Sequence, residues 1–232
     1  MSANLPYEIG KFQEHTKLLK QIKRDTNRYF RDIQQSGQLN RDILSAFLPE
    51  DDYQSLSRVC EKPATIIVVG QTCYAKVCII NELLGEPVLP AVEELDCQTS
   101  WRMIHIKYGS ISNVSLVLPG SFELAAALNA YEGSWECVPR GDLELKGNQK
   151  TDPALATAVA EVSLNHALLK AGAEIVCSPS NNEGDVKNIF QACCEDVLPI
   201  VLYAIEHDTL TEKVRNIFFC FFIFQLAFLF CM

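Results

Sequence analysis

The amino-acid sequence predicts an α/β fold, and three observations support this prediction. The run Ala64–Val69 is almost entirely β-branched, which is typical of a strand buried on both faces of a parallel sheet. Gly70 follows this run at once and a helical pattern begins soon after it, as in a phosphate-binding βα unit. Later strand-like runs alternate with helical stretches, which indicates an α/β fold.

The same patterns place the elements in order along the chain. The predicted strands are Ala64–Val69, Trp101–Tyr108, Val114–Leu118, Glu174–Cys177 and Pro199–Ile205. The predicted helices are 8–34, 41–60, Val77–Leu84, Phe122–Tyr131 and Ala154–Leu169.

The first helix carries an apolar stripe whose members recur at steps of three, four and seven: Ile9, Phe12, Leu19, Ile22, Tyr29, Phe30 and Ile33. Seven lysines and arginines lie between Lys11 and Arg31. Two interpretations follow. The helix either packs on the domain after it, with its charges in water, or docks on an acidic membrane or a protein partner.

Composition and charge divide the chain into three parts. Its 232 residues are 48% hydrophobic, which suits a globular core and excludes collagen-like and wholly disordered proteins. The net charge of −9 argues against nucleic-acid binding by broad neutralisation of phosphates. Basic and acidic residues balance over 1–60, but acids dominate beyond residue 60. We therefore expect a helical arm over 1–60, a domain over 61–216 and a Phe-rich hydrophobic tail over 217–232.

The tail is uncharged and allows two interpretations. Seven of the twelve phenylalanines fall in Ile217–Met232. One interpretation is a C-terminal membrane anchor, although an untilted helix needs about 20 residues to span a bilayer. The other is that Ile217–Phe222 begins a further buried strand and that the rest is an abnormal chain end.

The cysteines predict free thiols rather than a metal or disulfide framework. The N-terminus shows no secretory signal, so a cytoplasmic location is expected despite ten cysteines. The chain has no CxxC pair, and its four histidines stand far apart. We expect no catalytic residue, no metal site and no bound cofactor.

The segment from Gly70 to Val77 resembles a phosphate-binding loop with parts missing. Such loops read GxxxxGK[ST]: their backbone N–H groups wrap the phosphates, and the last hydroxyl binds Mg²⁺. Gly70 and Lys76 stand at the correct spacing and are the candidate cofactor-binding residues. Ala75 replaces the second glycine, however, and Val77 offers magnesium no oxygen.

The surrounding sequence resembles dynamin-like large GTPases. In those proteins an Asn-x-Leu-Leu-Gly run follows the phosphate loop, as Asn81–Gly85 does here. A later strand in that superfamily ends in Asp-Thr-Pro-Gly, but Cys177 and Ser180 stand at the Asp and Gly positions. The resemblance implies an incomplete P-loop GTPase-like sheet, and the departures predict that it does not hydrolyse GTP.

A narrower resemblance is to the N-terminal region of the dual serine/threonine and tyrosine protein kinase family. It rests on these strings: Phe30–Ile33, Gly70-Gln71, Leu118–Gly120, Gly133–Glu136, Asp142–Glu144, His166–Leu169 and Leu198–Ile200. The resemblance implies a role in signalling and cell-death control. The 232 residues contain no glycine-rich kinase loop, no His-Arg-Asp and no Asp-Phe-Gly, so the kinase function is not assigned to them.

The sequence therefore predicts a non-catalytic regulatory region. Its partners would be proteins or further copies of itself, bound through the helical arm and the GTPase-like domain. One alternative is a weak GTP-binding switch that uses Gly70 and Lys76. The other is a dynamin-like membrane protein anchored by residues 217–232.

Overall fold

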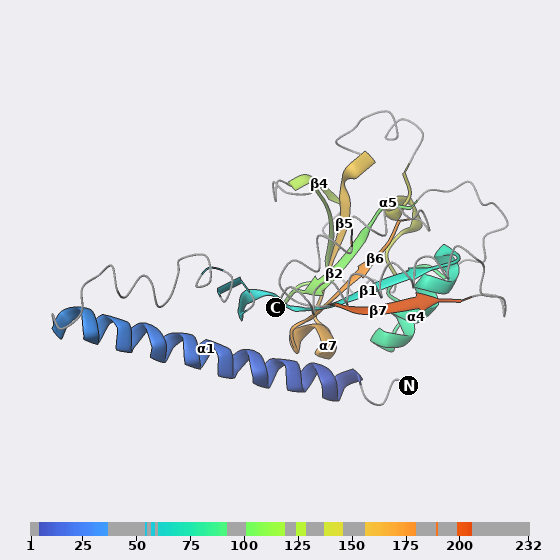
Figure 1. Cartoon of the computed structure of the whole chain (residues 1–232). Helices are drawn as coiled ribbons and strands as arrows, with labels where there is room; N and C mark the ends of the chain where they lie inside the picture. The colour runs from blue at the N-terminus through green and yellow to red at the C-terminus, as the bar shows by residue number, and fades with distance from the viewer. Residues whose placement is uncertain are drawn as a thin grey trace.

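The described part of the computed structural model forms one sheet with helices around it. It comprises residues 5–36, 54, 57–58, 60–91, 101–118, 124–128, 137–145, 156–179, 189 and 199–205. The sheet has seven strands in the order β4-β3-β5-β2-β6-β1-β7 (Figure 1). The strands are β1 (Ala64–Gly70), β2 (Ile104–Tyr108), β3 (Asn113–Val117), β4 (Leu124–Leu128), β5 (Val159–Leu164), β6 (Ala173–Cys177) and β7 (Ile200–Ala204).

The strand directions are mixed rather than all parallel. β1 runs parallel to both of its neighbours, β6 and β7. β2 is antiparallel to β6 but parallel to β5, and β3 is antiparallel to β5 and β4. The carboxyl ends of β6, β1 and β7 therefore meet at one edge of the sheet, which is where open α/β sheets bind their ligands.

Strand β1 is buried on both faces, as its β-branched sequence predicts. Ile66 and Val68 belong to the main core, together with residues of the helix α4 (Cys73–Leu84). Ile67 and Val69 point to the opposite face, where they pack in a smaller cluster with Val176 and Ile189. Because successive side chains alternate across a strand, one short run supplies both clusters.

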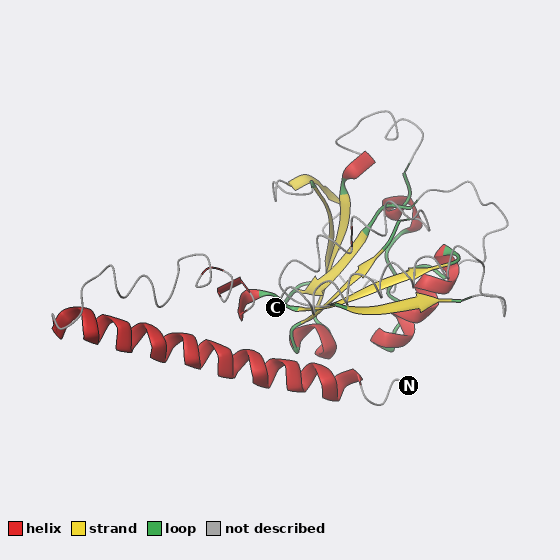
Figure 2. Cartoon of the chain, viewed as in Figure 1, coloured by secondary structure: helices red, strands yellow, loops and turns green. Residues whose placement is uncertain are grey.

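The prediction of a mixed α/β protein is confirmed, and so are five strands and two helices. β1, β2, β3, β6 and β7 lie within or across the predicted strands, and α4 covers the helix predicted after Gly70. Helix α1 (Leu5–Ser36) contains the whole of the predicted 8–34 helix. Figure 2 shows it as one unbroken helix.

Two predicted helices are wrong. The Phe122–Tyr131 stretch contains strand β4, and the Ala154–Leu169 stretch contains strand β5. The β4 sequence Leu-Ala-Ala-Ala-Leu favours a helix locally, but it pairs with β3 along its length. β5 is buried at five of its six positions, and Ala160, Val162 and Leu164 point into the main core while Glu161 and Ser163 alternate with them, which is the period of a strand and not of a helix. Among the described residues, helix remains at 156–157 and in the short α7 (Ala167–Lys170).

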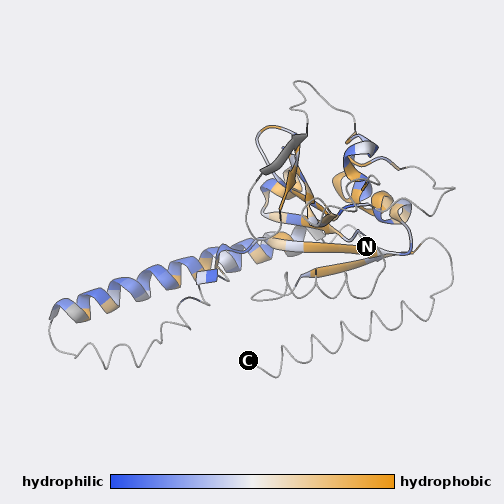
Figure 3. Ribbon diagram, turned by 90° about the horizontal axis from the view of Figure 1, so that it is seen from above, coloured by the Kyte–Doolittle hydropathy of each residue, from blue (hydrophilic) through white to orange (hydrophobic). Residues whose placement is uncertain are grey.

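Among the described residues, helix α1 contributes to the main core near its N-terminal end. Ile9 is 1% exposed and belongs to the main core cluster. Further along, Leu18 is 55% exposed and Tyr29 is 67% exposed. Figure 3 shows a largely hydrophilic helix that extends away from the apolar strands. The packing interpretation therefore holds for the first turns. Of the other stripe residues, Phe12, Leu19, Phe30 and Ile33 are half-buried, whereas Ile22 and Tyr29 are exposed.

Some predictions fall outside the described residues. Most of the 41–60 helix and all of the tail over 217–232 lie there. Within the described part of the chain, no helix is both long enough and apolar enough to cross a membrane.

Candidate functional site

The candidate site lies where β1 passes into α4. β1 ends at Gly70, and only Gln71 and Thr72 precede the first helical residue, Cys73. Thr72 caps the helix: its Oγ1 accepts a hydrogen bond from the Ala75 N–H at 3.1 Å. The Lys76 N–H donates to the Thr72 carbonyl at 3.3 Å. The two N–H groups at the Gly-Lys positions of a phosphate-binding loop are thus already bonded within the protein.

The side chain of Lys76 crosses from α4 to the end of β6. Lys76 is 2% exposed, and its Nζ donates to the Ser178 carbonyl at 2.7 Å. A bond from an ammonium group to a carbonyl is charge-assisted, and burial strengthens it further. In a working phosphate loop the lysine ammonium would contact a phosphate, whereas here it binds the backbone at the end of β6.

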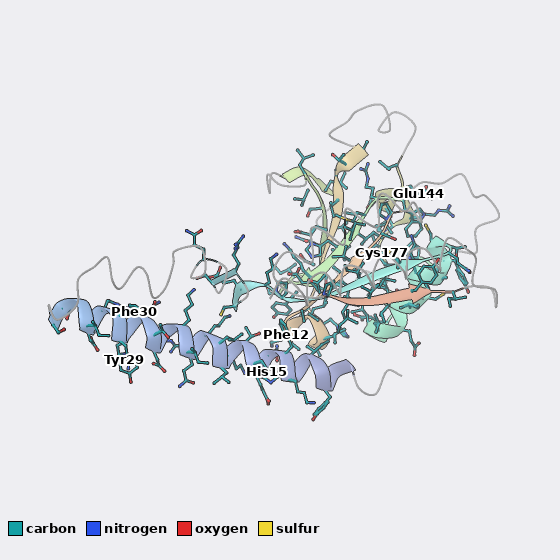
Figure 4. The ribbon with its side chains drawn as sticks, in the orientation of Figure 1. Phe12, His15, Tyr29, Phe30, Glu144 and Cys177 are labelled. Atoms are coloured by element: carbon teal, nitrogen blue, oxygen red, sulfur yellow. The ribbon has the colours of Figure 1, made fainter. Side chains whose placement is uncertain are left out.

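Cys177 occupies the position at which the resembled GTPases have aspartate. It pairs with Val68 across the β1–β6 ladder and is 3% exposed (Figure 4). Burial raises the pKa of the Cys177 thiol to about 11, while Lys76 acts against this rise and Cys73 adds to it. A neutral thiol offers little to a hard cation such as Mg²⁺. The hydroxyl of Ser178 is also buried and has no hydrogen-bond partner among the described residues.

Gly70 is required by packing. A Cβ built on Gly70 would lie 2.5 Å from the Ala204 Cβ and 2.8 Å from the Ala204 carbonyl oxygen. It would also lie 2.9 Å from the Lys76 Cγ. Gly70 therefore allows β1, β7 and the lysine stem to approach one another closely.

Asn81 and Gly85 explain the Asn-x-Leu-Leu-Gly run in structural terms. The Asn81 side chain donates to the Leu89 carbonyl at 2.8 Å and accepts from the Leu89 N–H at 2.9 Å. Gly85 adopts φ 67°, the left-handed conformation that ends helices and that a Cβ disfavours. The run thus ends α4 and fixes the segment after it.

The site combines predicted and unpredicted residues. Gly70 and Lys76, the two residues predicted from the motif, lie together, and whether they hold a nucleotide stays a prediction. Thr72 and Ser178 were not predicted. A threonine directly before a helical pattern is a known capping signal, but the role of Ser178 has no local signal. No metal-binding group of three or more His, Cys, Asp or Glu side chains occurs among the described residues.

The raised pKa of Cys177 predicts a pH-dependent stability. The folded state keeps the thiol proton to about pH 11, whereas the ordinary value is 9.0. The stabilisation is complete below pH 9 and is lost as pH rises from 9 to 11, by up to about 2–3 kcal/mol. The free energy of unfolding, measured in urea, should therefore fall more steeply between pH 9 and 11 for the wild type than for Cys177→Ala. The partly exposed Cys78→Ala variant should keep the wild-type slope, and an unchanged slope in Cys177→Ala would contradict the assignment.

Comparison of the sequence with known proteins finds one group of kinases. No family model matches the chain. A dual serine/threonine and tyrosine protein kinase of Strongylocentrotus purpuratus is 31% identical over 90% of this chain and 23% of its own length. The Pimephales promelas protein of that name is 33% identical over 92% of this chain and 26% of its own length. The Homo sapiens protein is 30% identical over 88% of this chain and 25% of its own length.

A solved structure of an oligomerised bacterial dynamin pair, described as sensing and tethering membranes at long range, is also similar. It has 13% identity and a TM-score of 0.43, and it covers 72% of this chain and 25% of that one. This TM-score is too low to establish a shared fold. The chain spans about a quarter of the length of the curated relatives it matches. Over nearly all of its own length, this chain is therefore similar to one region of the dual serine/threonine and tyrosine protein kinases.

Proposed function

We propose that this chain is a non-catalytic regulatory region of a dual-specificity protein kinase that acts in signalling and cell-death control. In this proposal the sheet is a GTPase-like domain that has lost GTP turnover and serves, with α1, as an interaction module. The sequence similarity to the kinases supports the family context.

The observation that carries the proposal is the bond from Lys76 Nζ to the Ser178 carbonyl at 2.7 Å. A nucleotide phosphate would have to break this buried, charge-assisted bond before it could use the lysine. It would also have to compete with Thr72 for the Ala75 N–H. The site therefore opposes phosphate binding at two independent points.

Magnesium chemistry is disfavoured for a third reason. Val77 stands where the hydroxyl ligand would be, and the Cys177 thiol, whose pKa is about 11, stays neutral at physiological pH. Mg²⁺ is bound through oxygen ligands, most often carboxylates and phosphates. Neither side chain offers it an oxygen.

Titration calorimetry of the full chain with Mg-GTP tests the proposal. We expect no saturable heat at micromolar nucleotide and no release of phosphate over hours. Saturable binding that Lys76→Met abolishes would contradict the proposal and support a GTP-binding switch. Binding that Lys76→Met leaves unchanged would place the nucleotide elsewhere and leave Lys76 in its structural role.

A further inference from the structure

Helix α1 carries a stripe of five exposed basic side chains. They follow one another at steps of three, four, four and three residues: Lys17, Lys20, Arg24, Arg28 and Arg31. This spacing places them along one side of the helix, over about 21 Å at 1.5 Å per residue. No acidic residue falls within the stripe.

The stripe has a cost to the helix. Lys20, Arg24 and Arg28 are like charges at i, i+4, and such pairs destabilise an isolated helix. Alternating opposite charges would have stabilised the same helix. Asp25 and Asp32 lie three and four residues from Arg28 and offset part of this repulsion, but the basic run itself is uninterrupted over about four turns, as expected of a surface kept for binding.

A second row on the same helix is apolar and exposed. Leu18 is 55% exposed, Ile22 is 49% exposed and Tyr29 is 67% exposed. Their spacings of four and seven residues place them on one face. Leu18 directly follows Lys17 and Tyr29 directly follows Arg28, so at about 100° per residue the basic stripe lies to one side of the apolar row. Figure 4 shows Tyr29 pointing away from the sheet domain.

From these two rows we propose that α1 binds anionic membrane surfaces in the plane of the interface. An exposed apolar row flanked by a Lys/Arg-rich face is the pattern of helices that lie at the boundary of headgroups and acyl chains. Leu18, Ile22 and Tyr29 enter this boundary, and the long basic stems extend to the lipid phosphates. The charge of the stripe is complementary to phosphatidylserine, and Figure 1 shows that the C-terminal part of α1 extends beyond the sheet.

An anionic membrane fits both rows better than other polyanions do. A nucleic acid or an acidic peptide would use the basic stripe but would leave the apolar row in water. The proposal does not depend on the state of the Gly70–Lys76 site, so it and the proposed function can fail separately.

Sedimentation of the full chain with vesicles tests the proposal. We expect binding to vesicles that contain phosphatidylserine, weakened by salt, and little binding to vesicles of phosphatidylcholine alone. Arg24→Gln with Arg28→Gln should lower the partition coefficient by about 30-fold, because two basic contacts to the surface are lost. Glutamine keeps the helix propensity close to that of arginine, so the helix stays formed.

Two further variants separate the contributions of charge and apolar contact. Leu18→Gln with Ile22→Gln should weaken binding to the vesicles, because two of the apolar side chains that enter the acyl-chain boundary are lost. Glu14→Gln with Asp25→Gln removes acidic charge beside the apolar row and should strengthen binding instead. Circular dichroism of each variant verifies that α1 is retained.

Three results would overturn the proposal. Equal binding to both kinds of vesicle would assign membrane contact to another apolar segment, such as residues 217–232. Full binding by the Arg24/Arg28 double variant would exclude the basic stripe. Stoichiometric capture of the full chain by polyglutamate in the presence of the anionic vesicles would identify an acidic protein as the partner instead.

Discussion

Replacing Gly70 with alanine should lower the free energy of unfolding by about 3 kcal/mol, the upper end of the usual cost of overpacking a core. The new Cβ would lie 2.5 Å from the Ala204 Cβ and 2.8 Å from the Ala204 carbonyl oxygen. Gly70 and Ala204 are direct partners across the β1–β7 ladder, so the backbone itself must shift. Urea unfolding followed by circular dichroism measures the loss.

Gly10→Ala is the matched control. Gly10 lies within α1, and a Cβ there has no neighbouring atom within 4 Å. Alanine should therefore stabilise the helix by about 0.5–1 kcal/mol, because glycine loses more backbone entropy on folding. If both variants changed stability in the same direction and to the same extent, the effect at Gly70 would come from chain entropy and not from the contact with Ala204.

Replacing Lys76 with alanine should cost about 2–5 kcal/mol, as truncation of a large buried side chain does. The substitution removes a stem that is 2% exposed and the donor to the Ser178 carbonyl. Lys76→Met keeps most of the stem volume but still leaves that carbonyl without its donor. It should cost about 1–3 kcal/mol, less than the alanine variant.

The exposed Lys170 supplies the control for charge alone. Lys170→Ala removes the same charge from the surface and should change stability by about 0.5 kcal/mol or less. A Lys76→Ala variant as stable as wild type would mean that the lysine is held for a ligand and does not support the fold. In that case Mg-GTP should raise the unfolding midpoint of the wild-type chain.

The order of strand, glycine and helix around Gly70 could be predicted because its signals are local. The β-branched residues indicate a strand covered on both faces, and Gly70 with the helical pattern after it indicates a turn into α4. The long helix α1 could be predicted for the same reason, since its apolar stripe recurs over many turns. Each of these patterns lies within one continuous stretch of the chain.

The strands β4 and β5 fall in segments that were predicted as helices. The β4 segment Leu124–Leu128 has a sequence that favours a helix, and only its pairing with β3 makes it a strand. Val159–Leu164 lies between β2 and β3 in the sheet, although β4 and a long stretch of chain separate it from them in sequence. Backbone pairing with β3 outweighed the local preference in β4, whereas the alternation of Ala160, Val162 and Leu164 with polar residues was the local signal that could have identified β5.

The sequence alone determined which residues stand at the altered phosphate-loop positions: Gly70, Ala75, Lys76 and Val77. It also determined the similarity to part of a kinase family. Only the tertiary structure decided what Lys76 does, because its partner Ser178 is 102 residues away along the chain. The reason is physical: a buried ammonium must find an acceptor, and which acceptor is within reach depends on how β6 aligns with β1 rather than on any pattern near the lysine.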